Sequence, residues 1–305
     1  MVDITHKITT LRTAVAQAIV KVGSAETIQA VLDKKVPKGD LLEVARTAGL
    51  FAVKNTASVI PDCHPVPIEY TGIHFECLEK TIKIEVTVKT IYKTGVEVEA
   101  MHGASIVALT IYDMLKPIDK QVEILTTKLL YKKGGKSDFE IKESPNLNVA
   151  ILVCSDSVSS GKKKDSTGKI ITEKLEKLGL TISNYDIIPD EMREIKNCVN
   201  QLCNKKTDLI ILAGGTGLSK KDVTPEAIIP LIDRRIPGIE EAIRSYGQER
   251  TPFAMLSRSV VGFKGQTLLM ALPGSINGAA ESINAVFPAI LHLFQLLNGF
   301  DHGKQ

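Results

Sequence analysis

The chain of 305 residues contains no tryptophan, and aromatic residues make up only 5% of it. Proteins that bind single-stranded nucleic acid stack bases on aromatic side chains, so this composition argues against that class. An excess of one charge is also absent, because 38 basic residues against 35 acidic residues leave a net charge of +3. Such a chain has no general electrostatic attraction to nucleic acid or to a membrane surface. We expect neither as a partner.

Long apolar segments and paired cysteine motifs are missing too. The most apolar late stretch, residues 285–297, includes Pro288, His292 and Gln295 and is too short and too polar to span a bilayer, so it predicts a core helix. The first residues lack a basic segment followed by an apolar core and predict no secretory signal. The five cysteines do not have the paired short spacings of a zinc site and are interpreted as mostly buried thiols. We expect a cytoplasmic protein.

The length exceeds the size at which one hydrophobic core usually stops growing, and 44% hydrophobic with 24% charged residues is typical of a folded protein. Residues 132–148 gather Lys, Gly, Ser, Pro and Asn between two patterned regions and predict a linker. We therefore expect two domains, residues 1–140 and residues 146–305.

The first region combines helices with amphipathic strands. Asp40, followed by Glu43, is a pattern that begins a helix, which should end before Pro61. Residues 81–92 alternate apolar and polar side chains and predict a half-solvated strand. Three further elements complete an α+β domain with an antiparallel sheet: a strand over residues 8–22, where a helix fits almost as well, a helix over 97–116 and a strand over 121–131.

The second region has a different rhythm. Continuous apolar runs at residues 148–154, 208–213 and 267–272 alternate with helical stretches, which predicts buried parallel strands in an α/β domain. Each run ends in a loop rich in Gly, Ser, Asp or Pro. Because ligands bind at the carboxyl ends of parallel strands, these loops should converge on one crevice.

Several side chains of the first region suit acid–base chemistry on a phosphorylated substrate. Asp113 and Lys116 share a face of the predicted helix and are either an acid/base pair or an ordinary surface ion pair. His64 follows a predicted helix end and is either functional or an ordinary loop histidine. Lys38 and Lys132 stand beside flexible glycines, where their ammonium groups suit phosphates.

Six motifs of this region occur in one order: KGD, ARTAGLFAVK, IPDCHP, KTGVEVEA, ASIVALTIYDMLK and KKGGKS. The set resembles the MoaC family, the cyclic pyranopterin monophosphate synthases of molybdenum cofactor biosynthesis, over residues 1–140. The resemblance implies a ferredoxin-like α+β fold and a lyase that converts 3',8-cyclo-7,8-dihydro-GTP into cyclic pyranopterin monophosphate with release of diphosphate. It implies no cofactor for this domain, and an oligomer, expected to be a hexamer, whose sites lie between subunits.

Residue roles follow from the same resemblance. Asp113 would be the catalytic acid/base and Lys116 its partner, while Lys38 and Lys132 would serve the phosphates and the rearrangement. Two residues depart from the family pattern: Asp62 replaces a usual apolar residue, and His102 a usual smaller one. The expected substrate-binding residues are Asp62, Cys63, His64, Glu97, Val98 and Glu99.

The second region carries a candidate phosphate-binding loop. Residues Gly214, Gly215, Thr216 and Gly217 follow an apolar run, so their backbone amides can approach an anion, although a plain turn fits as well. Asp190 and Asp222 could together hold Mg²⁺ against phosphate oxygens, or each could cap a helix. The run 162–164 of three lysines is either solvated charge or a guide for an anionic ligand.

The motifs SDSVSSG, IIPDE, GGTGLSKKDVTPE, PGIEEAIR, AMLSRSVVG and ALPGS together resemble the MoaB/MogA family. The resemblance implies an oligomer, expected to be a trimer, and a domain that binds molybdopterin and adenylylates it with Mg²⁺ and ATP. By motif, Asp190 and Asp222 correspond to the family's acidic pair, and residues 214–217 to its glycine loop. Ser155, Asp156 and Ser275 would line the same crevice, with Thr224 a weaker candidate.

The two resemblances predict a bifunctional enzyme of molybdenum cofactor biosynthesis that has contacts with other proteins of the pathway. One alternative is that the second domain is a non-catalytic module for pterin binding and oligomerisation. Another is a regulator that senses nucleotides. Turnover of the respective substrates distinguishes both alternatives from the enzyme.

Overall fold

The computed structural model describes residues 1–135, 138 and 146–297. The chain divides into two compact units, Met1–Phe139 and Glu140–Gln305, which are taken separately below. Of the predicted linker over 132–148, the first two residues belong to a strand, and residues 136–137 and 139–145 lie outside the described part.

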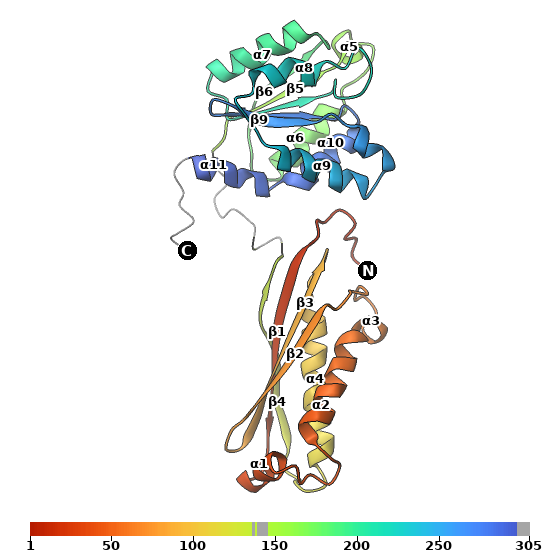
Figure 1. Ribbon diagram of the computed structural model, residues 1–305, viewed down its shortest axis with the longest axis vertical. Coiled ribbons are helices and arrows are strands. Elements are labelled where there is room, and N and C mark those ends of the chain that lie inside the picture. Colours follow the sequence, from red (N-terminus) through yellow and green to blue (C-terminus); the bar gives the residue numbers. More distant parts are fainter. Residues whose placement is uncertain (136–137, 139–145, 298–305) are drawn as a thin grey trace. The chain divides into compact units, whose positions relative to one another are not determined.

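The first unit is an antiparallel sheet of four strands with helices on one side (Figure 1). Its strand order, β2-β3-β1-β4, and its β-α-β-β-α-β succession define a ferredoxin-like fold, so the predicted α+β class is confirmed. The strands are β1 (Thr10–Lys21), β2 (Tyr70–Cys77), β3 (Thr81–Tyr92) and β4 (Glu123–Lys133); the helices are α1 (Ala25–Leu32), α2 (Leu41–Lys54), α3 (Thr56–Val59) and α4 (Glu97–Leu115).

Local sequence explains most of these elements. The predicted strand 8–22 is confirmed as β1, and alternate residues of β3, such as Ile84 and Val86, are fully buried. The Asp40 side chain accepts a hydrogen bond from the Glu43 backbone N–H at 3.4 Å, as the helix-start pattern predicts. The helix that follows Asp40 ends before Pro61, as predicted: α2 ends at Lys54, and a separate short helical turn, α3, covers the residues up to Val59. At the break the Asn55 side chain donates to the Phe51 carbonyl at 2.8 Å, which favours a helix end.

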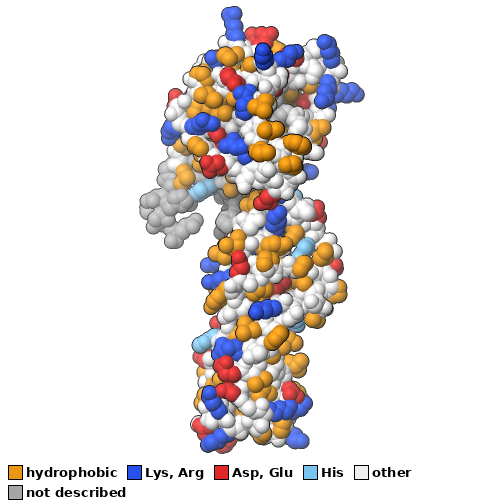
Figure 2. All heavy atoms as spheres, turned by 45° about the vertical axis from the view of Figure 1, so that its right-hand side comes forward, with side chains coloured by type: hydrophobic (Ala, Val, Ile, Leu, Met, Phe, Trp, Pro, Cys, Tyr) orange, Lys and Arg blue, Asp and Glu red, His pale blue; other side chains and the backbone are white. Residues whose placement is uncertain are grey.

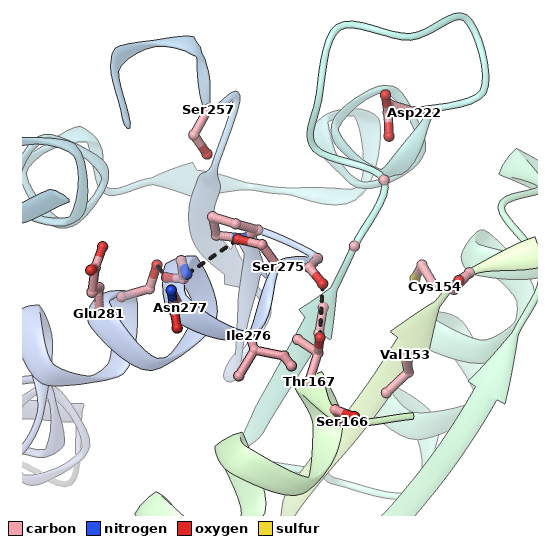
Figure 3. A pocket seen from close by; sticks show the side chains of 18 of the residues that line it. Val153, Cys154, Ser166, Thr167, Asp222, Ser257, Ser275, Ile276, Asn277 and Glu281 are labelled. Carbon is pink, nitrogen blue, oxygen red and sulfur yellow. Dashed lines mark hydrogen bonds between the residues drawn. The ribbon is translucent and has the colours of Figure 1, made fainter. Parts of the chain in front are cut away.

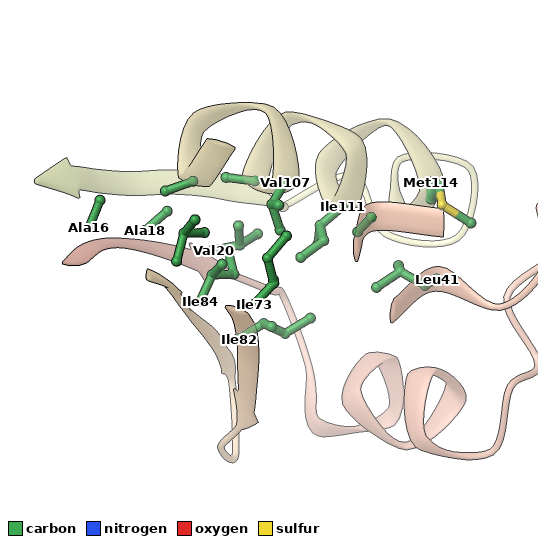
Figure 4. Packing of buried hydrophobic residues seen from close by; sticks show 14 of the residues in the cluster. Ala16, Ala18, Val20, Leu41, Ile73, Ile82, Ile84, Val107, Ile111 and Met114 are labelled. Atoms are coloured by element: carbon green, nitrogen blue, oxygen red, sulfur yellow. The ribbon is translucent and has the colours of Figure 1, made fainter. Parts of the chain in front are cut away.

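Close packing of α2 on α4 fixes the position of α4. A Cβ atom on Gly49 of α2 would lie 2.4 Å from Val107, and one on Gly103 of α4 would lie 2.6 Å from Val53, so only glycine allows this approach. The inner face of α4 then packs on small side chains of β1, including Ala16 and Ala18 (Figure 4). These contacts pack the middle of α4 between α2 and the sheet.

The second unit is a six-stranded sheet of order β6-β5-β7-β10-β9-β8. The strands β6, β5, β7 and β10 are parallel, and β9 pairs antiparallel with both of its neighbours, β10 and β8, which confirms the predicted mostly parallel α/β class. The strands are β5 (Val149–Cys154), β6 (Ile182–Ile188), β7 (Leu209–Ala213), β8 (Arg234–Arg235), β9 (Val260–Lys264) and β10 (Thr267–Leu272). All residues of β5, β7 and β10, the three predicted apolar runs, are buried.

Helices cover both faces of this sheet. One core contains residues of α7 and α8, and the other contains residues of α6, α9 and α10. The α-helices are α5 (Asp156–Ser159), α6 (Thr167–Glu176), α7 (Met192–Asn204), α8 (Thr224–Ile228), α9 (Pro237–Gln248), α10 (Ile276–Val286) and α11 (His292–Leu297), and the 3-10 helices are η2 (Ile229–Leu231), η3 (Pro252–Leu256) and η4 (Ala289–Leu291).

The core helix predicted over residues 285–297 is broken in the structure. Helix α10 ends at Val286, and η4 and α11 follow, with Ile290 and Phe294 buried in the core. Across the described residues, no single helix has the length and apolarity to cross a membrane, and only the bent pair Ile276–Val286 and Ala289–Leu297 passes that test as a combination.

Candidate active sites

The last turn of α4 carries a carboxylate between two ammonium groups. Asp113 Oδ2 lies 2.7 Å from Lys38 Nζ, and Asp113 Oδ1 lies 2.7 Å from Lys116 Nζ. Lys38 also donates to the Asp113 carbonyl at 3.0 Å. Hydrogen bonds from Lys116 and Lys38 lower the pKa of Asp113 to about 2, and the contact with Asp113 raises the pKa of Lys116. The carboxylate is therefore ionised at neutral pH.

A second group of polar side chains gathers at the first turn of α4. Lys132 Nζ, from β4, lies 2.7 Å from Glu97 Oε1. The Cys63 thiol donates to Glu99 Oε1 at 3.1 Å. Glu99 is buried, which raises its pKa, and burial together with the Glu99 acceptor raises the pKa of Cys63 to about 12. Cys63 thus remains a neutral hydrogen-bond donor.

The other expected substrate-binding residues lie near this second group. The Asp62 carboxylate lies 3.1 Å from the N-terminal amine, and His64 Nε2 lies 2.9 Å from the carbonyl oxygen of Val2. Val98 is exposed. His102, which departs from the family pattern, lies one turn further along α4, where its Nδ1 is 3.1 Å from Thr56 Oγ1.

The two groups occupy opposite ends of one helix. Glu97 and Asp113 are separated by 16 residues of α4, a length of about 24 Å at 1.5 Å per residue. Within one subunit the structure brings Lys38, Asp113 and Lys116 together but places Lys132 with the distant group. A single small molecule cannot contact both groups of the same subunit.

The second unit contains a cavity of about 940 Å³ at the carboxyl ends of β5, β7 and β10. Figure 3 shows Asp222 on one side of it and Asn277 and Glu281, from α10, on another. The convergence of strand-end loops predicted from the sequence is therefore present. Six of the expected residues line the cavity: Ser155, Asp190, Gly214, Gly215, Asp222 and Ser275.

The glycine loop after β7 touches both carboxylates of the expected acidic pair. Gly214 and Gly215 have φ angles of +115° and +62°, and a Cβ on Gly214 would lie 2.2 Å from the Cys154 carbonyl oxygen. A Cβ on Gly215 would lie 2.8 Å from Asp190 Oδ1, and one on Gly217 would lie 2.9 Å from Asp222 Oδ2. Backbone conformation and space both favour glycine at positions 214 and 215, and space favours it at position 217.

Asp190 and Asp222 fit a magnesium ion held against phosphate. Asp190 Oδ1 is buried and has no hydrogen-bond partner among the described residues. Burial, followed by the charges of Asp156 and Asp222, raises the pKa of Asp190, so a cation there would relieve an unfavourable charge. No group of three or more His, Cys, Asp and Glu side chains in the described part could hold a metal. Mg²⁺ usually takes only one or two carboxylates, with water and phosphates completing its shell.

Three expected residues of this region lie behind the cavity wall. Asp156 Oδ1 accepts a hydrogen bond from the Asp190 backbone N–H at 3.1 Å, and Thr216 is buried. Gly217 makes space for Asp222, as described above, but does not line the cavity.

Sequence reasoning missed much of the cavity wall. Of the lysine run 162–164, Lys163 and Lys164 line the cavity, and Thr167 Oγ1 donates to the Gly274 carbonyl at 2.8 Å (Figure 3). The lysine run was a usable signal for that wall. Two further wall residues, Arg244 and Ser257, fall within the motifs PGIEEAIR and AMLSRSVVG but were not singled out as site residues. Other wall residues lie outside the motifs of this region and include Arg250, Phe253, Asn277 and Glu281.

The two units carry separate candidate sites, two groups of charged side chains on α4 in the first and a strand-end cavity in the second. Two family models match the chain: the MoaC family over residues 1–135, and a probable molybdopterin binding domain over residues 150–292. A molybdenum cofactor biosynthesis bifunctional protein of Chlorobaculum tepidum is 39% identical over 302 residues, which cover 99% of this chain and 96% of that protein. This chain belongs to that family of bifunctional molybdenum cofactor biosynthesis proteins, with a MoaC domain followed by a MogA/MoaB-type domain.

Two further relatives match one unit each. A cyclic pyranopterin monophosphate synthase of Clostridium perfringens is 50% identical over 139 residues, which cover 45% of this chain and 87% of that protein. A crystal structure of the molybdopterin biosynthesis enzyme MoaB from Thermus thermophilus is 41% identical, covers 50% of this chain and 98% of that chain, and has a TM-score of 0.48.

Proposed function

We propose that the first unit converts 3',8-cyclo-7,8-dihydro-GTP into cyclic pyranopterin monophosphate and diphosphate, and that the second unit transfers the adenylyl group of ATP to molybdopterin. The observation that carries the first assignment is the Asp113 carboxylate between Lys38 and Lys116. The second rests on the glycine loop that lies against Asp190 and Asp222 at the strand ends.

In the first reaction, Asp113 acts first as a proton acceptor, and its carboxylate is already ionised at neutral pH. Lys116 stabilises the carboxylate and supplies a proton to the rearranging substrate. Lys38 neutralises negative charge on the phosphates, since its ammonium group is exposed to an incoming ligand. The substrate is also bound by groups at the opposite end of α4, which are Lys132, Cys63 and Glu99.

That opposite end must come from another subunit, because about 24 Å of helix separates the two groups within one chain. We infer an oligomer, a hexamer in keeping with the family resemblance, whose sites form between subunits. Phe51, Leu109 and Tyr112 on the helical side of the first unit are 66%, 53% and 40% exposed, which favours burial against a neighbour. Figure 2 shows hydrophobic side chains exposed among the charged ones on this unit.

In the second reaction, the cavity is large enough for a pterin together with part of a nucleotide. Lys163, Lys164 and Arg250 contribute positive charge to its wall and suit phosphates. Asp190 and Asp222 would hold Mg²⁺, which would neutralise phosphate charge. The glycine loop presents backbone amides where side chains would block the approach, and Ser275 lies at the first turn of α10 on the same cavity.

Two incubations of the full chain test the proposal. With the cyclised GTP intermediate alone, we expect cyclic pyranopterin monophosphate and diphosphate. With molybdopterin and Mg-ATP, we expect adenylylated molybdopterin. Binding of the GTP intermediate without chemical change would overturn the first assignment, and tight binding of molybdopterin without ATP consumption would overturn the second in favour of a non-catalytic pterin-binding module.

A further inference from the structure

Arg258 connects three parts of the loop that carries the glycines and Asp222. Its Nε donates to the Gly217 carbonyl at 2.8 Å, and its Nη2 donates to the Asp222 carbonyl at 2.7 Å. Its backbone N–H donates to the Thr216 carbonyl at 3.1 Å. One residue from the segment before β9 therefore holds both ends of the loop 217–222.

The third contact of the guanidinium is an ion pair. Arg258 Nη1 donates to Glu226 Oε1, in the first turn of α8. The planar guanidinium is held by this carboxylate while its other N–H groups reach the two carbonyls. Glu226 thus orients Arg258 for its loop contacts.

The loop in turn orients the Asp222 carboxylate. Asp222 Oδ2 accepts a hydrogen bond from the Ser219 backbone N–H at 2.8 Å, inside the segment whose two ends Arg258 holds. Arg258 itself is not part of the cavity wall, whereas Asp222 is, and so is Ser257, which precedes Arg258 in the chain. Its role is therefore to position other groups and not to contact the ligand.

We propose that Arg258 is a positioning residue for the second site: it fixes the glycine loop and Asp222 at the cavity, and Glu226 acts through it. The catalytic consequence rests on the proposed adenylyl transfer. A displacement of about 1 Å at a reacting group can lower a rate about 100-fold, so the arginine acts strongly without touching substrate.

The test uses the full chain with the variants R258M, R258K and E226Q, and R193M as a matched control. Arg193 is an exposed arginine of α7. For R258M we expect kcat for adenylyl transfer to fall about 100-fold with little change in KM for ATP. R258K, which keeps the charge but not the planar fork, should lose about tenfold, and R193M should behave like the unsubstituted chain.

A double-variant measurement of kcat tests whether Glu226 acts through Arg258. E226Q alone should lower kcat about fivefold, whereas the double variant E226Q/R258M should be no slower than R258M, because Glu226 acts through Arg258. Independent multiplicative losses would overturn that part of the proposal.

Hydrogen–deuterium exchange tests the positioning role of Arg258 without measuring adenylyl transfer. In R258M, backbone amides of residues 216–223 should exchange about tenfold faster, while those of β5, β7 and β10 stay unchanged. Faster exchange across the whole second unit, or a loop as protected as in the unsubstituted chain, would overturn the positioning role. If the unsubstituted chain performs no adenylyl transfer, the proposed reaction fails, and the exchange result still decides the role of Arg258.

Discussion

The two units place their functional groups in opposite ways. In the first unit, the candidate groups lie at the two ends of α4, about 24 Å apart. In the second unit, loops at the ends of β5, β7 and β10 enclose one cavity within a single chain. The difference follows from architecture, because a parallel sheet creates a crevice at its strand ends. In the described part of the first unit the sheet has no such strand-end crevice, and the proposed oligomer would complete its site with groups of a neighbouring subunit.

The largest expected effect is the separation of the two reactions by one substitution. Asp113→Asn keeps the shape of the side chain but removes the proton acceptor between Lys38 and Lys116. We expect the first reaction to fall about 10⁴-fold, measured as diphosphate release, because a general base and its charge are both lost. Adenylyl transfer and the melting temperature should stay unchanged. A parallel decline of activity and melting temperature would instead make Asp113 a structural ion-pair residue.

Mixing two inactive variants tests whether the units differ in their need for a neighbour. Asp113→Asn and Lys132→Ala damage opposite ends of α4. If sites form between subunits, random mixed oligomers have intact pairs at about a quarter of their sites, so about a quarter of the first activity should return.

The second unit supplies the control for the mixing experiment. Asp190→Asn and Asp222→Asn damage one cavity that a single chain encloses, so mixing these two variants should restore no adenylyl transfer. If adenylyl transfer recovers in this mixture, or if the first reaction does not recover in the mixture of Asp113→Asn and Lys132→Ala, the two units do not differ in their need for a neighbouring subunit.

A substitution in the second site should lower its reaction less than Asp113→Asn lowers the first reaction. Asp222→Asn removes one of two carboxylates beside the glycine loop, and adenylyl transfer should fall about 100-fold, with partial recovery at high Mg²⁺, since one carboxylate and the phosphates still bind the ion. The first reaction should not change. The assignment of Asp222 is wrong if added Mg²⁺ has no effect and substrate turnover is normal.

The fold could be predicted from the sequence because its signals are local. Alternation along β3, the cap at Asp40 and the apolar runs of β7 and β10 each reflect neighbours in the chain. The second site was partly predictable for the same reason, since a glycine loop and an aspartate directly follow strands.

What could not be predicted depends on contacts between distant segments. Arg258 meets Gly217 and Glu226 across more than thirty residues, and such a pairing leaves no periodic pattern. Likewise, Tyr185 of β6 donates to Asp165, whose other oxygen accepts from the Gly168 N–H at the start of α6. The separation of the two groups of the first unit follows from the length of α4, but the location of Lys132 beside Glu97 required the register of β4.

Electrostatic guidance should be a modest effect and confined to the enclosed cavity. Replacing Lys163 and Lys164, which line it, by Gln should raise KM for ATP about tenfold at low ionic strength, and the difference should shrink in high salt because the charges are screened. Lys162→Gln is the matched control, since Lys162 belongs to the same run but not to the wall. Salt-independent KM values, or an equal effect of Lys162→Gln, would make the whole run ordinary solvated charge.

The smallest expected effect is a change in stability at Asp190: the variant Asp190→Asn should be more stable although it is less active. Burial and the nearby Asp156 and Asp222 raise the pKa of this carboxyl, so folding favours its protonated form. A raised pKa contributes stability at acidic pH that is lost as the pH rises through the folded-state value. Asp190→Asn, which stays neutral, should therefore melt about 2 °C higher than the unsubstituted chain at pH 7.5 without Mg²⁺, and the gap should close toward pH 4. Asp113 in the first unit is the comparison. Its pKa is lowered, so Asp113→Asn should not raise the melting temperature at pH 7.5. A lower melting temperature for Asp190→Asn at pH 7.5 would mean that its charge is already compensated within the chain, and the case for a cation at this position would lose its physical basis.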